Sequence, residues 1–482
     1  MSREKSILVW FRRNLRLEDN RVLTSAISRG GPVIPLFIAD PKVRPGGPSA
    51  WWLGRSLASL QESFLRKKSR LILRRGNAPD VLAAVVRETG AAAVLWDESF
   101  DPVQRKIDEA VHAKLTRAGI FCGAFNDSLL YDPRTVRNKQ GTPFKVFTPF
   151  WNHCLSLEEP AAPVKFNGKL IAPSVWPRSE KLESLGFVSR AQWTEKIGRC
   201  WDPGEKGAKA VLQKFLRNRV ADYSEGRDHP AKEGTSRLSP YLHFGEISAR
   251  QVWHETRQHM IADRRPGIHR TGEAFLRQIV WREFAHHMLF HFPESVIRPL
   301  RKDFLKFQWR KDARLLRAWQ KGETGYPIVD AGMRQLWATG WMHNRVRMIA
   351  ASFLVKDLLQ PWQEGAAWFM ETLVDADLAN NTFGWQWVAG CGADAAPYFR
   401  IFNPVLQGNK FDSEGDYVRR WIPELSRVPA RFIHQPWEAP SEVLASAGVQ
   451  LDKNYPAPIV DHAAGRKRAL LAYHRMSEQR QK

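Results

Sequence analysis

Between Thr372 and Asn403 the sequence TLVDADLANNTFGWQWVAGCGADAAPYFRIFN gathers side chains that could carry out chemistry. Within about four helical turns it holds paired carboxylates, paired amides and paired indoles. These are Asp375, Asp377, Asn380, Asn381, Trp385 and Trp387. Buried carboxylates and amides are costly unless a partner meets them, so a purely structural helix has little use for this polarity. The segment therefore favours a polar, planar ligand flanked by tryptophans.

The overall composition favours redox chemistry, light absorption or nucleic acid. The chain has 20 tryptophans against 8 tyrosines, which inverts the usual preference and is typical of proteins that handle electrons, light or stacked bases. Its formal net charge of +23 indicates a polyanionic partner, with nucleic acid as the first candidate. A solubilising surface charge and attraction to anionic lipid remain alternatives at this point.

Several protein classes are disfavoured. No apolar run approaches the ~20 residues that span a bilayer and no signal peptide is evident, so we expect no membrane association. The 4 cysteines are far apart without a Cys-x-x-Cys pair, which disfavours zinc, iron–sulfur and disulfide sites and favours a reducing cytoplasm. His287 and His291 have metal-ligand spacing but lack a glutamate partner, so we expect packing or surface roles and no metal.

The elements that must position these residues begin with an alternating region. Strand-like runs alternate with amphipathic helical stretches over about the first 130 residues, which predicts a doubly wound parallel sheet. The strand candidates are 7–11, 33–39, 71–74, 92–97 and 120–125. The helix candidates between them are 51–67, 79–88 and 102–117. No Gly-x-Gly-x-x-Gly follows the first strand, so a nicotinamide site is not expected.

The rest of the chain is predicted to be a linker followed by helices. Residues 132–204 are rich in proline, glycine and isolated tryptophans without a sustained period, as in a long surface linker. Beyond the linker, helical periods occupy 209–223, 272–290, 330–359, 366–377 and 462–476. The predicted fold class is therefore an α/β N-terminal parallel-sheet domain over 1–131 and an all-α C-terminal domain over 205–482.

Five separated blocks resemble the DNA photolyase/cryptochrome family, and most closely its bacterial cyclobutane pyrimidine dimer photolyases. Besides the 372–403 segment, the blocks are LVWFRRNLRLEDN from Leu8, GTSRLSPYLHFGEIS from Gly234, IVWREF from Ile279 and GYPIVDAGMRQLWATGWMHNRVRM from Gly325. They occur in the family's order and cover essentially the whole chain. The resemblance implies an N-terminal antenna domain and a C-terminal domain that binds FAD and DNA.

The resemblance also implies an activity, the light-driven repair of cyclobutane pyrimidine dimers. Excited, reduced FAD would pass an electron to a dimer flipped out of UV-damaged DNA, as expected of a deoxyribodipyrimidine photo-lyase. The alternative is a cryptochrome-like blue-light photoreceptor with little or no repair activity. A basic nucleic-acid-binding module without a yellow chromophore is a third and more distant possibility.

The resemblance assigns a set of residues to FAD. Tyr223, Thr235, Ser236, Leu238 and Ser239 match contacts to the pyrophosphate and ribityl chain, although simple helix capping is an alternative for the hydroxyls. The other matching residues are Trp341, Asn344, Arg347, Asp375, Asp377 and Asn381. Arg347 and Asp375 match an ion pair against the flavin ring. Asn381 matches the position facing flavin N5, where an amide can both accept and donate a hydrogen bond.

The predicted lesion pocket combines residues from separate stretches of the chain. Trp281 and Trp387 resemble the indoles that line the family's pocket, and Asn344 and Met348 share a helix face at i, i+4. Gln278 departs from the glutamate that is usual three residues before the first of these tryptophans, so it can hydrogen-bond to the lesion but cannot supply a carboxyl proton. We therefore expect Gln278 to affect repair yield.

Two more groups of residues follow from the resemblance. Phosphate contacts at the pocket mouth match Arg227, Arg282, Arg345 and Arg400, which would make DNA binding salt-dependent. The family's relay of electrons from the flavin to the surface matches Trp385, Trp362 and Trp309, with aromatic core filling as the alternative.

The antenna chromophore and the oligomeric state are the least determined features. Relatives carry a folate or a deazaflavin, and Gln104 falls where one folate-binding branch has glutamate. We therefore favour methenyltetrahydrofolate and retain deazaflavin as an alternative. We expect a monomer.

Overall fold

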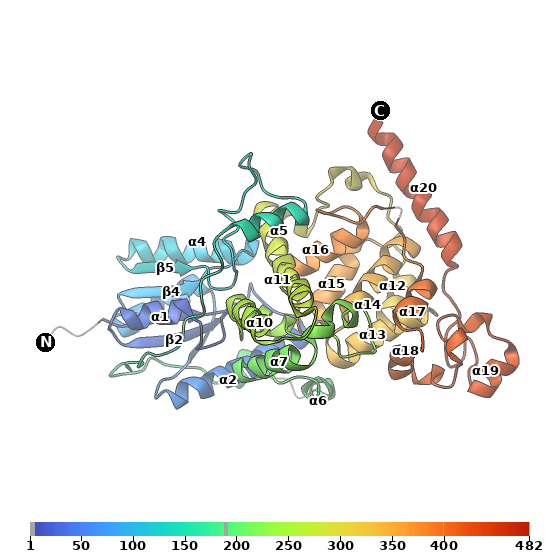
Figure 1. The fold of residues 1–482 in the computed structure, drawn as a ribbon. Helices are drawn as coiled ribbons and strands as arrows, with labels where there is room; N and C mark the ends of the chain where they lie inside the picture. The colour runs from blue at the N-terminus through green and yellow to red at the C-terminus, as the bar shows by residue number, and fades with distance from the viewer. Residues whose placement is uncertain (1–4, 188–190, 399, 482) are drawn as a thin grey trace. The chain divides into compact units, whose positions relative to one another are not determined.

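Packing divides the chain into two compact units in the computed structural model, which describes residues 5–187, 191–398 and 400–481 (Figure 1). The first, here called the sheet unit, comprises Met1–Ala221, Ser236–Pro293 and Val374–Ala376. The second, the helical unit, comprises Asp222–Thr235, Glu294–Leu373 and Asp377–Lys482. Because each unit combines separated stretches of sequence, the boundaries at residues 131 and 204 stay a proposal.

One five-stranded parallel sheet organises the sheet unit, in the order β3-β2-β1-β4-β5. The strands are β1 (Ile7–Phe11), β2 (Val33–Ala39), β3 (Ile72–Arg75), β4 (Ala93–Asp97) and β5 (Phe121–Phe125). The first two match their predicted bounds, β3 is shifted by one residue, and β4 and β5 each begin one residue later than predicted. The central strand β1 pairs with both β2 and β4, which confirms the doubly wound arrangement.

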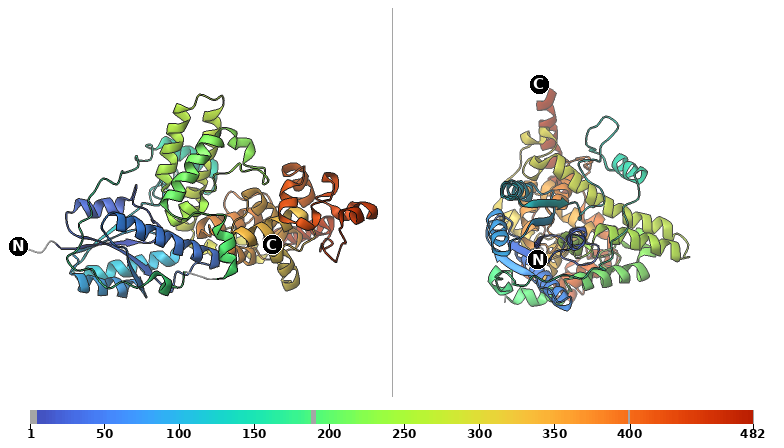
Figure 2. Two further views of the ribbon diagram at one scale, coloured as in Figure 1. Left: turned by 90° about the horizontal axis from the view of Figure 1, so that it is seen from below. Right: turned by 90° about the vertical axis from the view of Figure 1, so that its left-hand side faces the viewer.

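Helices cover both faces of this sheet (Figure 2). They are α1 (Arg21–Ser28), α2 (Gly47–Arg66), α3 (Ala78–Thr89) and α4 (Pro102–Arg117). On one face Leu8, Ile34 and Val94 pack with Leu82 of α3 and Val111 of α4. Every residue of β1 is buried, so the strand reads as a continuous apolar run, as expected for a parallel sheet covered on both sides.

The sheet unit continues through further helices, two of which lie in the predicted linker. These are α5 (Phe147–Ser156), α6 (Gln192–Gly198), α7 (Glu205–Asn218), α9 (Ser239–Phe244), α10 (Ala249–Ala262) and α11 (Ile268–His291). The stretch 132–204 is therefore not devoid of regular structure. Helix α5 buries Phe147, Phe150 and Cys154 at i, i+3, i+7 spacing, a pattern too short to stand out beside Pro149.

The helical unit contains the helices that carry most of the predicted site. They are α8 (Tyr223–Gly226), α12 (Ala313–Lys321), α13 (Pro327–Thr339), α14 (Asn344–Ser352), α15 (Trp362–Thr372), α16 (Leu378–Ala389), α17 (Pro404–Phe411), α18 (Asp416–Trp421), α19 (Ser441–Ala447) and α20 (His462–Gln481). A π-helical turn, η5 (Phe353–Asp357), follows α14. Among the described residues no helix is long and apolar enough to cross a membrane.

Two predicted helices of this unit are interrupted, which corrects their bounds. The 330–359 helix breaks after α13, where Gly340 takes a φ of 67° that ends the helix in the left-handed conformation. The 366–377 helix ends at Thr372. Asp375 and Asp377 therefore precede α16 instead of lying inside the single four-turn helix that their spacing allows.

Candidate functional site

Two helices of the helical unit, α14 and α16, begin at polar caps, and the cap of α16, Asp377, belongs to the predicted site. The side chain of Asp377 accepts hydrogen bonds from the backbone N–H of Asn380 at 2.9 Å and from its Nδ2 at 2.8 Å. His343 caps α14 by accepting the N–H of Arg345 at 3.2 Å. A cap satisfies N–H groups that the helix itself leaves without partners. Asp377 thus positions the start of α16 and the amides that follow it.

Helix α16 has a buried face and an open one. Trp385 is 2% exposed, whereas Asn380, Asn381, Gly384 and Trp387 lie outside the core. A Cβ atom placed on Gly384 would meet nothing within 4 Å, so there is free space beside the helix there. Asn381 donates its Nδ2 to the carbonyl oxygen of Ala366 at 2.9 Å, which leaves its Oδ1 as an acceptor. This face therefore carries an amide and an indole on either side of the open space at Gly384.

Helix α14 packs against α16 and carries its own predicted residues. Asn344 is exposed, and its Nδ2 lies 3.9 Å from the sulfur of Met348, so the shared face expected from their spacing is confirmed. Arg347 donates from Nε to the carbonyl oxygen of Met342 at 2.8 Å, and its Cζ lies 6.0 Å from the ring centroid of Trp341. These contacts hold the guanidinium in one orientation.

The hydroxyl-bearing loop lies just ahead of the short helix α9. Ser239 is the first residue of α9, and no side chain caps that helix. Instead the hydroxyl of Ser236 accepts from the N–H of Leu238 at 3.4 Å, within the loop. Simple N-capping, the alternative for these residues, is therefore not their arrangement. In the helical unit Tyr223 is 6% exposed, and burial raises the pKa of its phenol.

The lesion-contact candidates of the sheet unit lie on α11. Trp281 stacks face to face on Phe147, with centroids 3.5 Å apart and planes 6° apart. Gln278, one turn earlier, is half-buried and donates to the carbonyl oxygen of Ala274 at 3.4 Å. Phe147 was missed by the sequence argument, because it lies in the stretch interpreted as linker. Its stacking covers one face of the Trp281 ring and fixes the orientation of the indole.

The four candidate DNA contacts differ in how their charges are matched. Arg345 pairs with Asp228 at 2.7 Å and lies over the ring of Phe411, and Arg227 lies over Tyr223. Arg282 donates to the carbonyl oxygen of Ser128 and pairs with Glu283 at 3.2 Å. Arg400 is exposed. Within the helical unit Arg345 and Arg227 are linked through the adjacent Asp228, whereas Arg282 serves local structure in the sheet unit.

The predicted relay tryptophans have different surroundings. Trp385 contacts Phe369 at 5.1 Å and Trp319 at 6.0 Å between ring centroids. A Cβ on Gly365 would lie 2.0 Å from the Trp385 ring, so only glycine allows α15 to approach so closely. Trp362 is 1% exposed and Trp309 is half-buried. Trp319 was not anticipated, because its only signal in the sequence was the general excess of tryptophan.

Comparison with known protein families decides the relationship. The family model for DNA photolyase matches residues 7–165, and that for the FAD binding domain of DNA photolyase matches residues 275–475. The chain belongs to the DNA photolyase family. It is 48% identical to a deoxyribodipyrimidine photo-lyase of Agrobacterium fabrum over 97% of both chains. It is also 40% identical to Cryptochrome-2 of Arabidopsis thaliana, over 99% of this chain and 80% of that one.

Solved structures agree with the sequence relatives. A bacterial class III photolyase from Agrobacterium tumefaciens superposes with a TM-score of 0.96 at 47% identity, covering 99% of both chains. A cryptochrome from Synechocystis superposes with a TM-score of 0.90 at 26% identity, covering 98% of this chain and all of that one. Both fold predictions, the parallel-sheet domain and the helical FAD domain, are confirmed by these photolyase-family structures.

The FAD binding domain of a photolyase implies FAD, and the residues present fit it. The space beside Gly384, the free acceptor of Asn381 and the half-exposed Trp387 suit a flat, polar ring on α16. At the start of α14, His343 is 2% exposed, and its Nε2 has no hydrogen-bond partner among the described residues. Burial lowers the pKa of His343 to about 4, so this imidazole is neutral at physiological pH.

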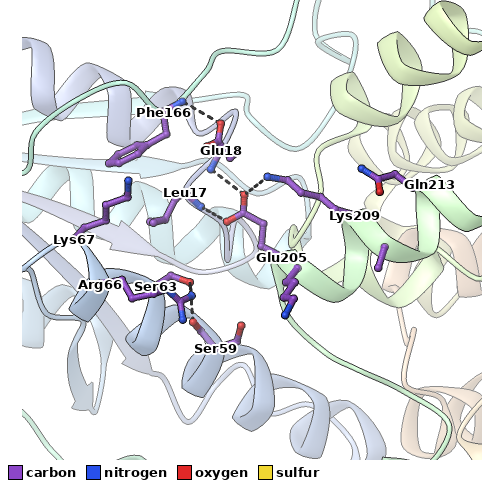
Figure 3. Close-up of a pocket in the computed structure, with 12 residues that line it drawn as sticks. Leu17, Glu18, Ser59, Ser63, Arg66, Lys67, Phe166, Glu205, Lys209 and Gln213 are labelled. Carbon is purple, nitrogen blue, oxygen red and sulfur yellow. Dashed lines mark hydrogen bonds and ion pairs between the residues drawn. The ribbon is translucent and has the colours of Figure 1, made fainter.

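A separate cavity of about 700 Å³ in the sheet unit contains none of the predicted photolyase residues (Figure 3). Glu205 projects into it and accepts from the backbone N–H of Leu17 at 2.9 Å and of Glu18 at 3.2 Å. Lys209 pairs with the same carboxylate at 3.2 Å. An ion pair and the backbone hydrogen bonds of Glu205 therefore line this pocket, which is separate from the residues predicted to bind FAD.

The remaining predictions concern Gln104, for the antenna chromophore, and the histidine pair His287 and His291, for which no metal was expected. Gln104 is 4% exposed, and its Nε2 has no partner among the described residues, so a buried donor is available there. The rings of His287 and His291 are 4.5 Å apart, and burial lowers the pKa of His287 to about 3. Within the described ranges no group of three or more His, Cys, Asp or Glu residues could hold a metal ion.

Proposed function

We propose that this protein is a deoxyribodipyrimidine photo-lyase that repairs cyclobutane pyrimidine dimers in UV-damaged DNA with light. The observation that carries the proposal is the open face of α16, where Asn381 and Trp387 border free space in a chain that matches both photolyase family models. FAD bound there would supply the absorption of light and the electron that splits the dimer. The chain itself supplies binding, orientation and exclusion of water.

The residues predicted to bind FAD hold and orient the cofactor. Asn381 uses its Nδ2 to bind the carbonyl oxygen of Ala366 and keeps Oδ1 as an acceptor, which suits an N–H at flavin N5. Arg347 and Asp375 flank the ring with opposite charges, which fixes its tilt and the local field. The supporting observation is that Met342 holds the Arg347 side chain by a 2.8 Å hydrogen bond. Tyr223, Thr235, Ser236, Leu238 and Ser239 bind the pyrophosphate and ribityl chain, and Trp341, Asn344 and Asp377 complete the set.

The lesion contacts are assigned to aromatic and polar side chains. Trp281 and Trp387 stack on the extruded bases, and the support for Trp281 is the orientation that Phe147 imposes on its ring. Asn344 and Met348 contribute one polar and one apolar contact from α14. Gln278 hydrogen-bonds to the lesion in place of a carboxylic acid. Arg227, Arg282, Arg345 and Arg400 bind phosphates, supported by the net charge of +23.

A cryptochrome-like photoreceptor is the second candidate. The specific observations in its favour are Gln278 and the 40% identity to an Arabidopsis cryptochrome. Asn381 and the DNA-facing arginines favour repair.

Methenyltetrahydrofolate remains our proposed antenna, with deazaflavin as the alternative, and a related archaeal photolyase from Sulfolobus tokodaii is described with two FAD molecules. The 4 cysteines are free, which supports a reducing cytoplasm, and we propose a monomer.

The deciding experiment is illumination of the FAD-loaded, chemically reduced protein with UV-irradiated oligothymidylate. We expect the ultraviolet absorbance of intact thymines to recover in the light and not in the dark. The variant Gln278→Glu should increase the yield of repair per absorbed photon without changing FAD content. Bound FAD without recovery in either protein would favour the photoreceptor.

A further inference from the structure

Helix α12 of the helical unit (Figure 1) carries a row of basic side chains along one face. Arg314, Arg317 and Lys321 lie at i, i+3 and i+7, so they share that face, and all three are exposed. We call these three residues the α12 stripe. Among the described residues none of their side chains has an ion-pair or hydrogen-bond partner. The charges of the stripe are therefore available to an external anion.

The opposite face of α12 is packed into the core of the helical unit. Trp319 is 0% exposed, stacks on Phe369 with centroids 6.0 Å apart and donates its indole N–H to the carbonyl oxygen of Ala350 at 2.9 Å. Leu315 and Leu316 are half-buried. An amphipathic helix that binds a membrane must insert its apolar face between the lipid head groups. Because that face is already packed inside the protein, α12 offers a partner only its charges.

The α12 stripe belongs to a wider basic stretch, Lys302–Lys321. It contains seven lysines and arginines, and all seven are exposed. Besides the stripe these are Lys302, Lys306, Arg310 and Lys311. The two acids of the stretch are already engaged, because Asp303 pairs with Arg301 at 2.7 Å and Asp312 caps α12 by accepting the N–H of Arg314 at 3.0 Å. Seven cations against two carboxylates leave a strong positive excess on this surface.

The C-terminal helix adds to this basic surface. Helix α20 packs against the 3-10 helix η4 (Lys302–Lys306), where the rings of Phe304 and Tyr473 lie 6.2 Å apart, and Arg475 of α20 is exposed. Like charges gathered on one surface destabilise the folded state through mutual repulsion, which a bound polyanion relieves. None of the seven cations of the basic stretch is among the predicted contacts to FAD, to the lesion or to phosphates, so the proposed function does not account for them.

The spacing of the stripe fits the phosphate backbone of DNA. A helix rises about 1.5 Å per residue, so Arg314 and Lys321 are about 10.5 Å apart along its axis. Phosphates of one DNA strand follow one another every ~3.4 Å along the duplex, so three cations over this length suit about three phosphates. Contacts of this kind neutralise charge without reading base edges, so they depend neither on sequence nor on a lesion.

We propose that the α12 stripe is a second DNA contact, which binds the phosphate backbone of undamaged duplex DNA independently of the lesion pocket. The inference goes beyond the proposed function, since it requires neither a dimer nor light and would hold equally for a photoreceptor. Binding of this kind speeds association with DNA and keeps the protein on the duplex between lesions. It is sensitive to salt, because the bound cations release counterions from the DNA.

The test is binding of the FAD-loaded full chain to an undamaged, fluorescently labelled duplex over a range of salt concentrations, followed by anisotropy. The stripe variant combines Arg314→Gln, Arg317→Gln and Lys321→Gln, which removes three charges and keeps good helix formers. We expect weaker binding and a slope of log affinity against log salt that is smaller by about 3, because each lost phosphate contact lowers it by roughly 0.9. Arg314→Lys with Arg317→Lys keeps the charges and should retain the slope.

The matched control removes the same number and kind of charges from helices of the sheet unit. It combines Arg87→Gln on α3 with Lys106→Gln and Arg117→Gln on α4, all at exposed positions. The control changes the net charge as much as the stripe variant does, so it measures the effect of long-range attraction alone. We expect its salt slope to stay close to that of the unmodified protein.

Three outcomes would overturn the inference. An unchanged slope in the stripe variant would mean that the stripe is only solvated, and equal losses in the stripe variant and the control would assign binding to net charge. Loss of binding to phosphatidylglycerol vesicles, with DNA binding intact, would make the partner a lipid surface. Because the duplex contains no dimer, failure of the repair assay would contradict the proposed function and leave this inference standing.

Discussion

The two units each contain a dense aromatic cluster, and the two clusters are built differently. In the sheet unit Trp52 contacts Trp51, Trp201, Tyr241 and Phe244 at centroid distances of 4.9 to 6.3 Å. We call these five residues the Trp52 cluster. All of them are less than a tenth exposed, and Trp52 itself is 0% exposed. In the helical unit Trp309, Phe307, Tyr398 and Tyr473 contact one another in that order, and we call them the Trp309 series. It passes from a half-buried indole through two buried rings to a half-buried phenol.

The comparison teaches that ring density alone does not make an electron relay. No ring of the Trp52 cluster lies at the surface, and the indole N–H of Trp52 donates to the buried carboxyl group of Glu246 at 3.0 Å. The cluster therefore stabilises the fold through burial and hydrogen bonding. A relay needs a ring that can lose its charge or proton to solvent, and only the helical unit's series ends on one. The predictions below test that distinction.

The largest expected effect is on photoreduction. Trp385→Phe should slow reduction of oxidised FAD in light by more than an order of magnitude, because it removes the buried indole beside the open face of α16. Repair by enzyme that is already reduced should change far less. Trp51→Phe, the control in the Trp52 cluster, should leave photoreduction unchanged. Transient absorption and the oligothymidylate assay measure the two activities, and an equal loss from both tryptophan variants would break the comparison.

Two glycine substitutions should distinguish a glycine needed for close packing from a glycine that leaves space for the cofactor. Gly365→Ala places a methyl group 2.0 Å from the Trp385 ring, so we expect a loss of about 1–3 kcal/mol in unfolding free energy from overpacking. Gly384→Ala meets no atom within 4 Å, and alanine in a helix should stabilise the FAD-free protein by about 0.5–1 kcal/mol. It should nevertheless weaken FAD retention. Urea unfolding measures the stability of both variants, and flavin absorbance measures how much FAD they retain. Tight FAD binding by Gly384→Ala would mean that the flavin ring does not lie beside Gly384.

Burial of Glu246 beside the Trp52 cluster should make the unfolding free energy depend on pH. Burial raises the pKa of Glu246 to about 8, so the folded state keeps a proton that an exposed carboxyl releases near pH 4.5. Unfolding free energy therefore falls as pH rises between these two values, by at most about 1.4 kcal/mol per pH unit from this group. Glu246→Gln lacks this dependence, so its unfolding free energy should increase relative to that of the unmodified protein from pH 5.5 to 8. A constant difference in urea unfolding across that range would contradict the burial argument.

The smallest effect is expected at Trp319, which lies beside Trp385 but outside the predicted relay. Trp319→Phe removes the hydrogen bond from its indole N–H to the carbonyl oxygen of Ala350 at 2.9 Å. Losing one such bond costs about 1 kcal/mol of unfolding free energy. Photoreduction should be nearly unchanged. A slowing comparable to that of Trp385→Phe would make Trp319 a relay member.

Much of this protein was determined by local features of its sequence. The β1 and β2 strands were predicted with their observed bounds, because a strand covered on both faces is a continuous apolar run between polar turns. Asn344 and Met348 were placed on one face by helical spacing, and the distance between their side chains confirms it. The family was recognised from motif residues, since a motif records which side chains a bound group needs.

The tertiary structure alone decided which side chains meet across distant stretches. Phe147 covers Trp281 from α5, a helix within the stretch that its composition led us to interpret as a linker. Gly365 is required only because the Trp385 ring lies against it. Tyr398 and Tyr473 are far apart in sequence and stack only because α20 packs beside η5. Periodicity reports the face a residue occupies within its own helix or strand. The partner on that face depends on how the helices pack, and no local pattern encodes that.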